Sequence, residues 1–430
     1  MWKKVKIEEV SEKVGMGPFG SSIKVETFVT TGIPIISGQH LHGSRLNENE
    51  GFNFLSLEHA EKLKNANVFK GDIVFTHAGN IGQVAYIPKC SKYNRYVISQ
   101  RQFYMRCDTS KAIPEFVVAF FKTPEGQHKL LANRSQVGVP SISRPVTYLR
   151  SIEIPLPPLP EQRAIAHILG TLDDKIELNR RMNETLEAMA QALFKSWFVD
   201  FDPVRAKAEG RDTGLPKEIA DLFPDGFEES ELGEIPKGWE VVPFTNVVEI
   251  VGGGTPKTSV ENYWNGNIPW FSVEDSPPET EIWVIDTKRK ITGEGLLNSS
   301  TKILPVGSTI ITARGTVGKV ALVGVPMAMN QSCYGIRGRN GINFWTYFLT
   351  RELIGGLKKR AHGSVFDTIT RNTLESVLIV DPPNNVLVSF ENQVKTFLDR
   401  IHLSLNESKS LSHTRDLLLP KLLSGDLKTG

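Results

Sequence analysis

The sequence predicts an α+β fold, in which two similar β-rich domains are separated by a long antiparallel coiled coil of two helices. Three observations lead to this prediction: a heptad pattern near the middle of the chain, a second half that repeats the first, and a second helical stripe near the end. At 430 residues, the chain can bury a large core and divide into two to four domains.

The composition is that of an ordinary globular protein, with 40% hydrophobic and 23% charged residues. No apolar run reaches the roughly 18–20 residues that span a bilayer, and no apolar segment follows the lysines of the N-terminus, so we expect no signal peptide. Cys90, Cys107 and Cys333 are widely separated, which predicts free thiols in a cytoplasmic protein and no zinc site. The net charge of +2 means that any nucleic-acid binding must use local basic patches.

Residues 1–155 form the first predicted domain, a mixture of short strands and helices. Its apolar runs are punctuated by Gly, Asn and Pro, as short strands usually are; they lie at residues 71–75, 83–87 and 96–98. Residues 113–121 are predicted to be helical, with Pro114 at an early helical position.

Residues 156–202 contain the predicted central helix. From Pro160 to Asp202, residues at spacings of four and three form a seam that lasts about four heptads: Ile165, Leu169, Leu172, Ile176, Asn179, Asn183 and Leu186. This pattern indicates a helix that packs on a similar helix. The alternative is a long amphipathic helix lying on a globular core.

Residues 203–237 are rich in Pro, Gly and acidic residues and are predicted to be a linker without a core of its own. Gly238 and Trp239 then open a second β-rich domain, predicted to span residues 238–381. The C-terminal segment, residues 382–430, is predicted to be helical again, mainly from Asn385 to Leu423.

The second half of the chain repeats the first, a relation to be tested before any fold is assigned. At an offset of 237 residues, Trp2, Val5, Val10, Gly15 and Gly17 match Trp239, Val242, Val247, Gly252 and Gly254. The densest match has an offset of 236 and aligns GDIVFTHAGNIGQVA from Gly71 with GSTIITARGTVGKVA from Gly307. Further on, residues 141–144 match residues 368–371. Small drifts in the offset are those that loops of different length would produce.

The C-terminal helix carries the second stripe of the predicted coiled coil. Its seam includes Val394, Phe397, Ile401, Leu411 and Leu418. Both stripes become polar near the middle, at Asn179 and Asn183 in the first and at Ser404 and Ser408 in the second. Antiparallel pairing would bring these polar positions together, which costs some stability but fixes the register. The alternative is that each stripe packs on its own β domain.

A duplicated domain and helix could read two separated DNA half-sites. A helix of about 40 residues is on the order of 60 Å long, and two turns of B-DNA span roughly 70 Å. The two domains share a framework but differ in their polar loop residues, which predicts two different half-sites.

The candidate DNA-binding residues are polar side chains in expected loops, chiefly Arg, Lys, Asn and Gln, which bind base edges and phosphates. In the first domain they are Ser21, Ser22, Lys24, Gln39, His40, His42, His77, Asn80, Arg101, Gln136 and Arg144. In the second they are Thr255, Lys257, Thr258, Arg314, Thr316, Lys319, Asn330, Gln331, Arg337, His362 and Arg371. The glycines between residues 78 and 82 could let a phosphate approach the backbone, but shaping a hairpin is the favoured role.

We find no catalytic site in the sequence. The segment from Asp381 to Asn384, DPPN, lacks the aromatic residue of the amino-methyltransferase tetrapeptide. No glycine-rich nucleotide fingerprint or Walker A motif is present. His40 and His42 have no further candidate ligands nearby and are not expected to bind a metal. The sequence therefore predicts a binding protein without catalytic residues or metal ligands.

Three segments, in this order over two repeats, resemble the specificity (S) subunits of type I restriction–modification systems. They are PPLPEQR from Pro157, GEIPKGW from Gly233 and TRDLLLPKLLSG from Thr414. The resemblance covers essentially the whole chain. It implies two target-recognition domains, a coiled coil that sets the spacer between two DNA half-sites, two methyltransferase (M) subunits as partners, and restriction (R) subunits that join for cleavage. S-adenosylmethionine, ATP and Mg²⁺ would bind to those partners. A nuclease or methyltransferase acting alone, or a coiled-coil scaffold that binds no DNA, are the alternatives.

Overall fold

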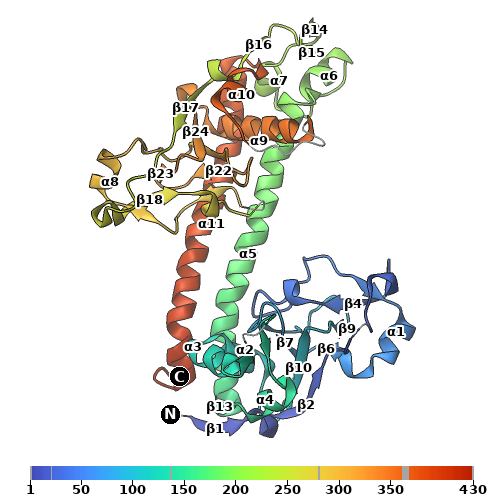
Figure 1. Cartoon of the computed structure of the whole chain (residues 1–430). Helices are drawn as coiled ribbons and strands as arrows, with labels where there is room; N and C mark the ends of the chain where they lie inside the picture. Colours follow the sequence, from blue (N-terminus) through green and yellow to red (C-terminus); the bar gives the residue numbers. More distant parts are fainter. Residues whose placement is uncertain (1, 21, 136–137, 279–280, 361–367, 429–430) are drawn as a thin grey trace. The chain divides into compact units, whose positions relative to one another are not determined.

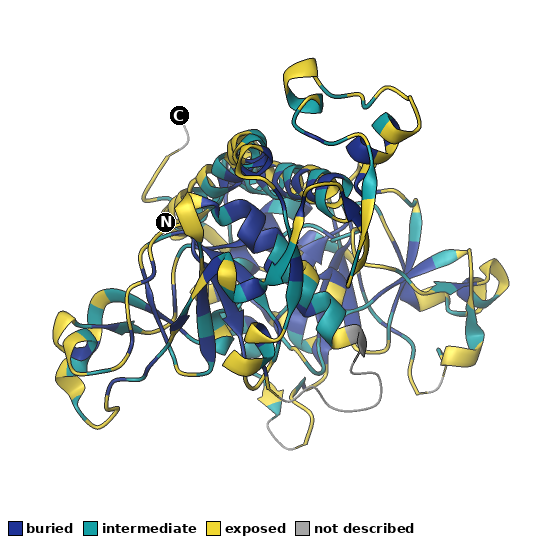
Figure 2. Ribbon diagram, turned by 90° about the horizontal axis from the view of Figure 1, so that it is seen from above, coloured by how far each residue is buried: buried dark blue, intermediate teal, exposed yellow. Residues whose placement is uncertain are grey.

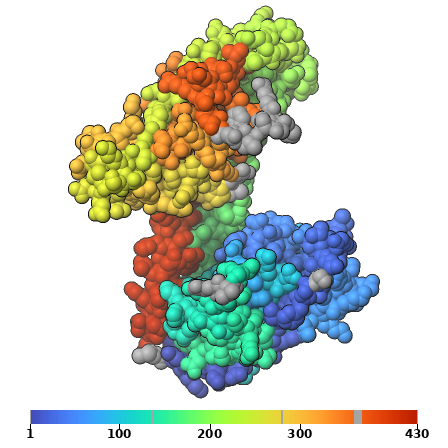
Figure 3. All heavy atoms as spheres, in the orientation of Figure 1, coloured from blue at the N-terminus to red at the C-terminus, as the bar shows by residue number. Residues whose placement is uncertain are grey.

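The computed structural model describes the chain except for Met1, Ser21 and residues 136–137, 279–280, 361–367 and 429–430. It consists of two compact units, Met1–Ile176 with Ser410–Gly430, and Glu177–Lys409. Each unit contains one β-rich domain and a part of both long helices, α5 (Leu159–Phe198) and α11 (Asn384–Ser424) (Figure 1). Figure 3 colours the first domain blue to teal and the second yellow to orange.

The first domain is built on two sheets. A four-stranded sheet has the order β2 (Ser11–Met16), β10 (Gln102–Cys107), β7 (Ile73–Thr76) and β8 (Val84–Tyr86). A five-stranded sheet has the order β3 (Phe28–Val29), β5 (Phe54–Leu55), β4 (Ile33–Ile36), β9 (Arg95–Ile98) and β6 (Asn67–Phe69). Two further strand pairs are described in this domain. Strand β1 (Lys3–Lys6) pairs with β13 (Glu153–Leu156), and β11 (Arg134–Ser135) pairs with β12 (Ser141–Ile142).

Among its described residues the first domain has four short α-helices: α1 (Leu57–Lys62), α2 (Pro114–Lys122), α3 (Pro124–Leu131) and α4 (Pro145–Ser151). The helix predicted at residues 113–121 is confirmed as α2. Pro114 is its first residue. The proline ring fixes φ at a helical value, and an N–H at this position would have no intrahelical acceptor, so its absence costs no hydrogen bond. Phe116, Phe120 and Phe121 of α2 are buried in the core.

The second domain repeats this arrangement. Its main sheet has the order β17 (Val248–Gly252), β24 (Cys333–Gly338), β21 (Thr309–Thr312), β22 (Val320–Val323) and β19 (Trp283–Val284). A smaller sheet contains β20 (Lys290–Ile291), β18 (Trp264–Phe271) and β23 (Ala328–Met329), and β16 (Glu240–Pro243) pairs with β25 (Leu378–Asp381). The helices are α8 (Gly293–Leu297), α9 (Asn343–Arg360) and α10 (Arg371–Glu375). The ladder β17-β24-β21-β22 corresponds to β2-β10-β7-β8, which confirms the internal repeat.

One part of the predicted alignment is wrong by one residue. Strand β2 contains a register shift, because Cys107 pairs with Ser11 whereas Arg106 pairs with Lys13. The ladder between β17 and β24 has no such shift. The β-bulge adds one residue to the first copy, so beyond it the offset is 236 rather than 237. Gly17 therefore corresponds to Gly253, not to Gly254.

In the first unit, α5 and α11 pack against each other and against the domain. Ile165 and Leu169 of α5 are buried in one cluster with Leu419 and Leu422 of α11. The guanidinium of Arg415 lies 2.8 Å from the carboxylate of Asp173. The residue numbers run in opposite directions along the two helices, so the pairing is antiparallel.

In the second unit, the paired helices contain a buried polar layer. Asn179 Nδ2 donates to Ser408 Oγ at 3.1 Å and to Glu407 Oε2 at 2.8 Å. Ser404 Oγ donates to Asn183 Oδ1, and Asn179 Oδ1 is buried without a hydrogen-bond partner among the described residues. A polar layer of this kind lowers stability but disfavours other registers.

The other predicted seam residues vary in burial. Val394 and Ile401 are buried, while Leu172, Ile176, Leu186, Phe397, Leu411 and Leu418 are half-buried. Along both long helices the described residues contain no segment that is long and apolar enough to cross a membrane, and the same holds for the other described helices.

The segment expected to be a linker, residues 203–237, is folded onto the second unit. It contains α6 (Asp202–Ala208), α7 (Lys217–Ala220) and a hairpin of β14 (Phe227–Ser230) and β15 (Gly233–Pro236). Val204 and Phe223 are buried in the core of the second unit, and the Phe223 ring lies 5.0 Å from that of Trp197. The few apolar residues of this polar segment anchor it, which composition alone does not indicate.

Each long helix caps a helix of its domain. Gln162 of α5 is buried; its Oε1 accepts from Ile113 N at 3.0 Å, next to the start of α2. Glu391 of α11 accepts from Trp345 N, in the first turn of α9, at 2.7 Å. Burial raises the pKa of Glu391 to about 7, although hydrogen bonds from the α9 backbone oppose this shift.

Alanine at Gly17 or Gly253 should destabilise the domain that contains it, by about 1–3 kcal/mol. A Cβ at Gly17 would overlap the carbonyl oxygen of Ser99, and one at Gly253 would overlap that of Asn330. Gly252→Ala is the control, since a Cβ there meets no atom within 4 Å. Urea unfolding of the three variants tests these close backbone contacts, and the explanation would be contradicted if Gly252→Ala cost as much as Gly253→Ala.

Glu391→Gln should weaken the pH dependence of stability in the second unit. A carboxyl whose folded-state pKa is raised contributes stability that is fully present below its unfolded pKa of about 4.5 and is lost as the pH rises through about 7. The amide does not titrate, so the variant should be more stable than the parent at pH 8. Urea unfolding between pH 5 and 8 measures this, with exposed Glu352→Gln as the control. Equal pH slopes for all three proteins would contradict the assignment.

Candidate functional site

Four segments of the first domain meet at one end of its main sheet, and we call them the first loop cluster: residues 37–42, 77–83, 99–102 and 140–144. His77 N donates to Arg101 O at 2.9 Å, and Ile142 N donates to His77 O at 2.8 Å. Gly79 N donates to Pro140 O at 3.0 Å, and Ser99 N to Ile36 O at 2.9 Å. Main-chain hydrogen bonds thus join three of these loops, and the bond from Ser99 to Ile36 anchors the start of the fourth. Figure 2 colours the residues by burial, with many strand and helix positions dark blue and many outer loops yellow.

The turn between β7 and β8 needs its glycines for conformation. Gly79 has a φ of +84° and Gly82 a φ of +90°, values that residues with a Cβ rarely adopt. Gly315 and Gly318 occupy the same positions in the second domain with φ values of +80° and +79°. The hairpin-shaping role favoured for these glycines is therefore present in both copies.

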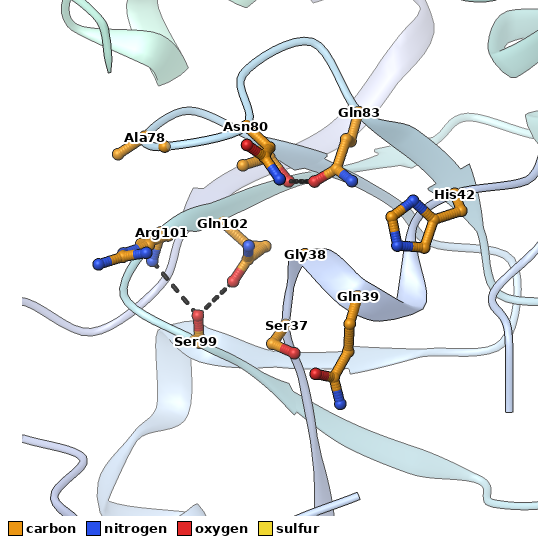
Figure 4. Close-up of a pocket in the computed structure, with 12 residues that line it drawn as sticks. Ser37, Gly38, Gln39, His42, Ala78, Asn80, Gln83, Ser99, Arg101 and Gln102 are labelled. Carbon is orange, nitrogen blue, oxygen red and sulfur yellow. Dashed lines mark hydrogen bonds between the residues drawn. The ribbon is translucent and has the colours of Figure 1, made fainter. Parts of the chain in front are cut away.

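The first loop cluster surrounds a polar hollow of about 500 Å³ (Figure 4). It is lined by Ser37, Gly38, Gln39, His42, Thr76, Ala78, Gly79, Asn80, Gln83, Ser99, Arg101 and Gln102. The guanidinium of Arg101 is the one permanently charged group of this lining, and no carboxylate is among the lining residues. The rest are amides, hydroxyls, one imidazole and backbone.

Two amide side chains of the hollow are oriented by hydroxyl groups. Thr76 Oγ1 donates to Gln83 Oε1 at 3.1 Å. Ser99 Oγ accepts from Arg101 N at 3.4 Å and donates to Gln102 Oε1. The side chain of Gln102 is 1% exposed, so it forms part of the floor. In both glutamines the carbonyl oxygen already accepts one internal hydrogen bond, and in Gln83, which is half-buried, the Nε2 group can donate to a ligand.

The second domain contains an equivalent second loop cluster, residues 254–258, 272–275, 313–319, 330–332 and 368–371. Ala313 N donates to Ser332 O at 2.7 Å, and Ile369 N donates to Ala313 O at 2.9 Å. Asn330 N donates to Phe271 O at 2.9 Å. These bonds repeat those of His77, Ile142 and Ser99, so the two clusters share one backbone framework.

The side chains on the two frameworks differ. Gln102 pairs with Thr76 across the ladder, and Cys333 pairs with the matching Thr312. The positions of Arg101, Gln102 and Gln83 are therefore held by Ser332, Cys333 and Lys319 in the second domain. Conversely, exposed Arg314 stands at the position of Ala78.

Sequence reasoning missed an aromatic platform beneath residues 254–258. Trp270 Nε1 donates to Gly254 O at 3.0 Å, and Trp264 Nε1 donates to Lys257 O at 3.3 Å. The two indole rings are 5.1 Å apart and nearly perpendicular. The guanidinium carbon of Arg289 lies 3.7 Å from the centroid of the Trp264 ring, within the range of a cation–π contact. Two tryptophans six residues apart were the available signal.

The structure brings several candidate residues of the first domain together. Gln39, His42, Asn80 and Arg101 line the hollow. His77 lies beside it, and burial lowers its pKa. Ser22, Lys24 and Arg144 are exposed on loops. Ser21, Gln136 and His362 lie outside the described residues.

The candidates of the second domain also lie mostly in its loop cluster. Thr255 donates a hydrogen bond to Gln331, and Asn330 Oδ1 accepts from Ser332 N at 3.0 Å. The exposed members are Lys257, Thr258, Arg314, Thr316, Gln331 and Arg371, whereas Lys319 is half-buried. Arg371 also forms a 3.0 Å ion pair with Glu375.

Two candidates are corrected by the structure. His40 is 1% exposed and stacks on Phe52, with ring centroids 4.4 Å apart, so it is unsuited to contact DNA. His40 Nδ1 accepts a hydrogen bond from Ser37 N at 3.0 Å, and Asp275 accepts the equivalent bond from Ser272 N in the second domain. Burial lowers the pKa of His40. Among the described residues, His, Cys, Asp and Glu side chains form no group of three that could hold a metal.

Arg337 is the second correction. It lies four residues after the first residue of β24, about 13 Å along the strand from the loop cluster. Its guanidinium forms a 3.0 Å ion pair with Glu249 of the neighbouring strand. Arg337 therefore supports the sheet and is not part of the cluster.

Trp270→Phe should loosen residues 254–258 while preserving the aromatic core. The change leaves the Gly254 carbonyl, which accepts from a buried indole, without its partner, at a cost of about 1–3 kcal/mol. Hydrogen exchange of the amides in this loop should become faster in the variant. Exchange in the first loop cluster is the internal control, and unchanged protection of residues 254–258 would argue against the platform.

Comparison with known proteins gives one consistent family. The model of the family described as "Type I restriction modification DNA specificity domain" matches residues 1–188 and 236–401. The chain is 26% identical over 471 residues to the specificity subunit of the type I restriction enzyme HindI from Haemophilus influenzae, covering 99% of each chain. It is also 26% identical over 455 residues to the MjaIX specificity subunit from Methanocaldococcus jannaschii, covering 99% of this chain and 94% of that protein.

The crystal structure of the type I restriction–modification S subunit from M. genitalium is similar in fold. The TM-score is 0.60 with 15% sequence identity, over 98% of this chain and 96% of that one. At this low identity the likeness concerns the fold alone.

Proposed function

We propose that this chain, which belongs to the type I restriction–modification DNA specificity family and is a specificity subunit with two recognition domains, reads an asymmetric DNA site in two parts. Each domain would read one half-site with its loop cluster. The bases between the half-sites would remain unread.

The observation that carries this proposal is one backbone framework with two different sets of side chains. The hydrogen bonds of His77 and Ala313 that hold the loop clusters are the same. The side chains on them are those that bind base edges and phosphates, including Arg101 in the first cluster and Arg314 in the second. Equivalent frameworks would hold their loop side chains against DNA in the same way, whereas different side chains on those loops would select different bases.

We propose that the paired helices set the length of the unread spacer. The antiparallel pairing in each unit and the polar layer at Asn179 and Asn183 support one preferred register. A helix pair with a single register has a fixed length, which is what a constant spacer requires.

We propose two methyltransferase subunits and restriction subunits as partners, which would bind S-adenosylmethionine, ATP and Mg²⁺ and carry out the chemistry. The chain itself would be non-catalytic. Exposed apolar side chains on the long helices support a protein partner there: Leu178, Leu403 and Leu417 are 59%, 62% and 54% exposed.

Two other functions account for less of the structure. A nuclease or methyltransferase acting alone would need a constellation of catalytic groups, which neither loop cluster offers among its described residues. A coiled-coil scaffold would use the long helices but would leave the polar hollow and the aromatic platform without a purpose. Both loop clusters instead present side chains that are typical of DNA readout.

Lengthening both helices by one heptad should lengthen the spacer. Seven residues inserted after Asn179 and seven after Glu407 add about 10 Å to the pair, or about three base pairs at 3.4 Å each. Selection of bound sequences from random duplex DNA should then recover the same two half-sites, about three base pairs further apart.

The matched control inserts seven residues in α5 alone. This change shifts the polar layer out of register and should abolish recovery of a two-part site. An unchanged spacer in the doubly lengthened chain would refute the role of the helices.

A further inference from the structure

We infer that the hollow of the first loop cluster binds the major-groove edge of a guanine in a G·C pair, with Arg101 as the residue that determines this specificity. The inference rests on the proposed DNA-reading function and names the base read at one position. It concerns the first domain only, because the second has Ser332 at the position of Arg101.

The position of the guanidinium is the first argument. Arg101 is exposed, and its carbonyl oxygen is held by the 2.9 Å hydrogen bond from His77 N. The guanidinium lies over the glycine turn: a Cβ built on Gly79 would be 3.6 Å from Arg101 Nη1. Among the described residues, the structure gives Arg101 no carboxylate partner, in contrast to Arg337 with Glu249 or Arg371 with Glu375. Its donors are therefore available at the rim of the hollow (Figure 4).

The hydrogen-bonding character of the hollow is the second argument. Gln83 and Gln102 use their Oε1 atoms to accept from Thr76 and Ser99. Reading adenine with such an amide would require both its oxygen and its nitrogen, because adenine presents one acceptor and one donor. Each oxygen already accepts one hydrogen bond, so a ligand in the hollow meets mainly the Nε2 donor of half-buried Gln83 and the guanidinium donors of Arg101.

Guanine is the base that suits a set of donors. Its major-groove edge presents two acceptors, N7 and O6, and arginine can bind both at once. Cytosine presents an amine donor, and the hydrogen bond from this amine is usually accepted by aspartate or glutamate. No carboxylate lines the hollow, so the hollow does not suit cytosine. Gln39 complements this pattern at the rim: its Nε2 donates to Gly51 O at 3.2 Å, so its oxygen is left to accept from the amine of the paired cytosine.

The difference between the domains is the third argument. Ser332 and Cys333 replace Arg101 and Gln102, so the second framework has neither the guanidinium nor the amide at these positions. Arg101→Ser therefore exchanges one native residue of this framework for another. Because Arg101 is an exposed turn residue whose backbone makes the anchoring bonds, the variant should fold as the parent does.

The test begins with the full-length chain and random duplex DNA, which gives the two half-sites of the parent protein. Binding of Arg101→Ser is then measured on the selected duplex and on copies in which each guanine of the first half-site is replaced by 7-deazaguanine, which lacks N7, or by inosine, which keeps N7 and O6. Arg150→Ser, an exposed arginine on α4 outside the cluster, is the matched control.

The parent and Arg150→Ser should lose about tenfold to hundredfold in affinity when 7-deazaguanine replaces one particular guanine, and little with inosine there. Arg101→Ser should bind the unmodified site about tenfold to hundredfold more weakly, should be insensitive to 7-deazaguanine, and should select a motif that is degenerate at that position only. A uniform loss on all sequences, with 7-deazaguanine still harmful, would assign Arg101 to a phosphate and overturn the inference. A parent chain that selects no motif would instead refute the proposed function itself.

Discussion

The structure depends on the antiparallel contact between two helices that lie far apart in the sequence. Both helices contribute side chains to the core of each unit. The core of the first unit includes Leu419 and Leu422 from the end of the chain, and the core of the second includes Phe194 and Trp197 from the central helix. The hydrophobic contacts stabilise both cores, while the polar layer around Asn179 favours one register.

The two domains separate the requirements of folding from those of recognition. The strand order β2-β10-β7-β8 recurs as β17-β24-β21-β22, and the glycine turns and the main-chain bonds of His77, Ile142 and Ser99 recur as well, because the backbone must reach the same conformation. The side chains at the loop tips make few of these bonds and can differ. His40 and Asp275 show the distinction well, since different residues make the same capping bond inside equivalent loops.

Much of the fold could be predicted from the sequence, because heptad spacing and an internal repeat can be read directly from the order of the residues. The helices, the repeat and the glycine turns are visible in the residue pattern. The β-bulge in β2 was not visible in the sequence, because a single extra residue changes which residues of β10 pair with β2 but leaves the residue pattern almost unchanged. His40 and Arg337 were misplaced for a related reason, since burial and ion pairing depend on residues remote in the sequence. The hydroxyl groups that orient Gln83 and Gln102, and the tryptophan platform under Lys257, are likewise products of tertiary packing.

The most direct measurement of the central claim, that the chain reads a DNA site in two parts with a fixed gap, is methylome sequencing of cells that carry the intact system. The account predicts methylation at one motif made of two different specified parts with a constant number of unspecified base pairs between them. Methylation at a continuous motif, at a palindrome, or at half-sites with variable spacing would contradict it.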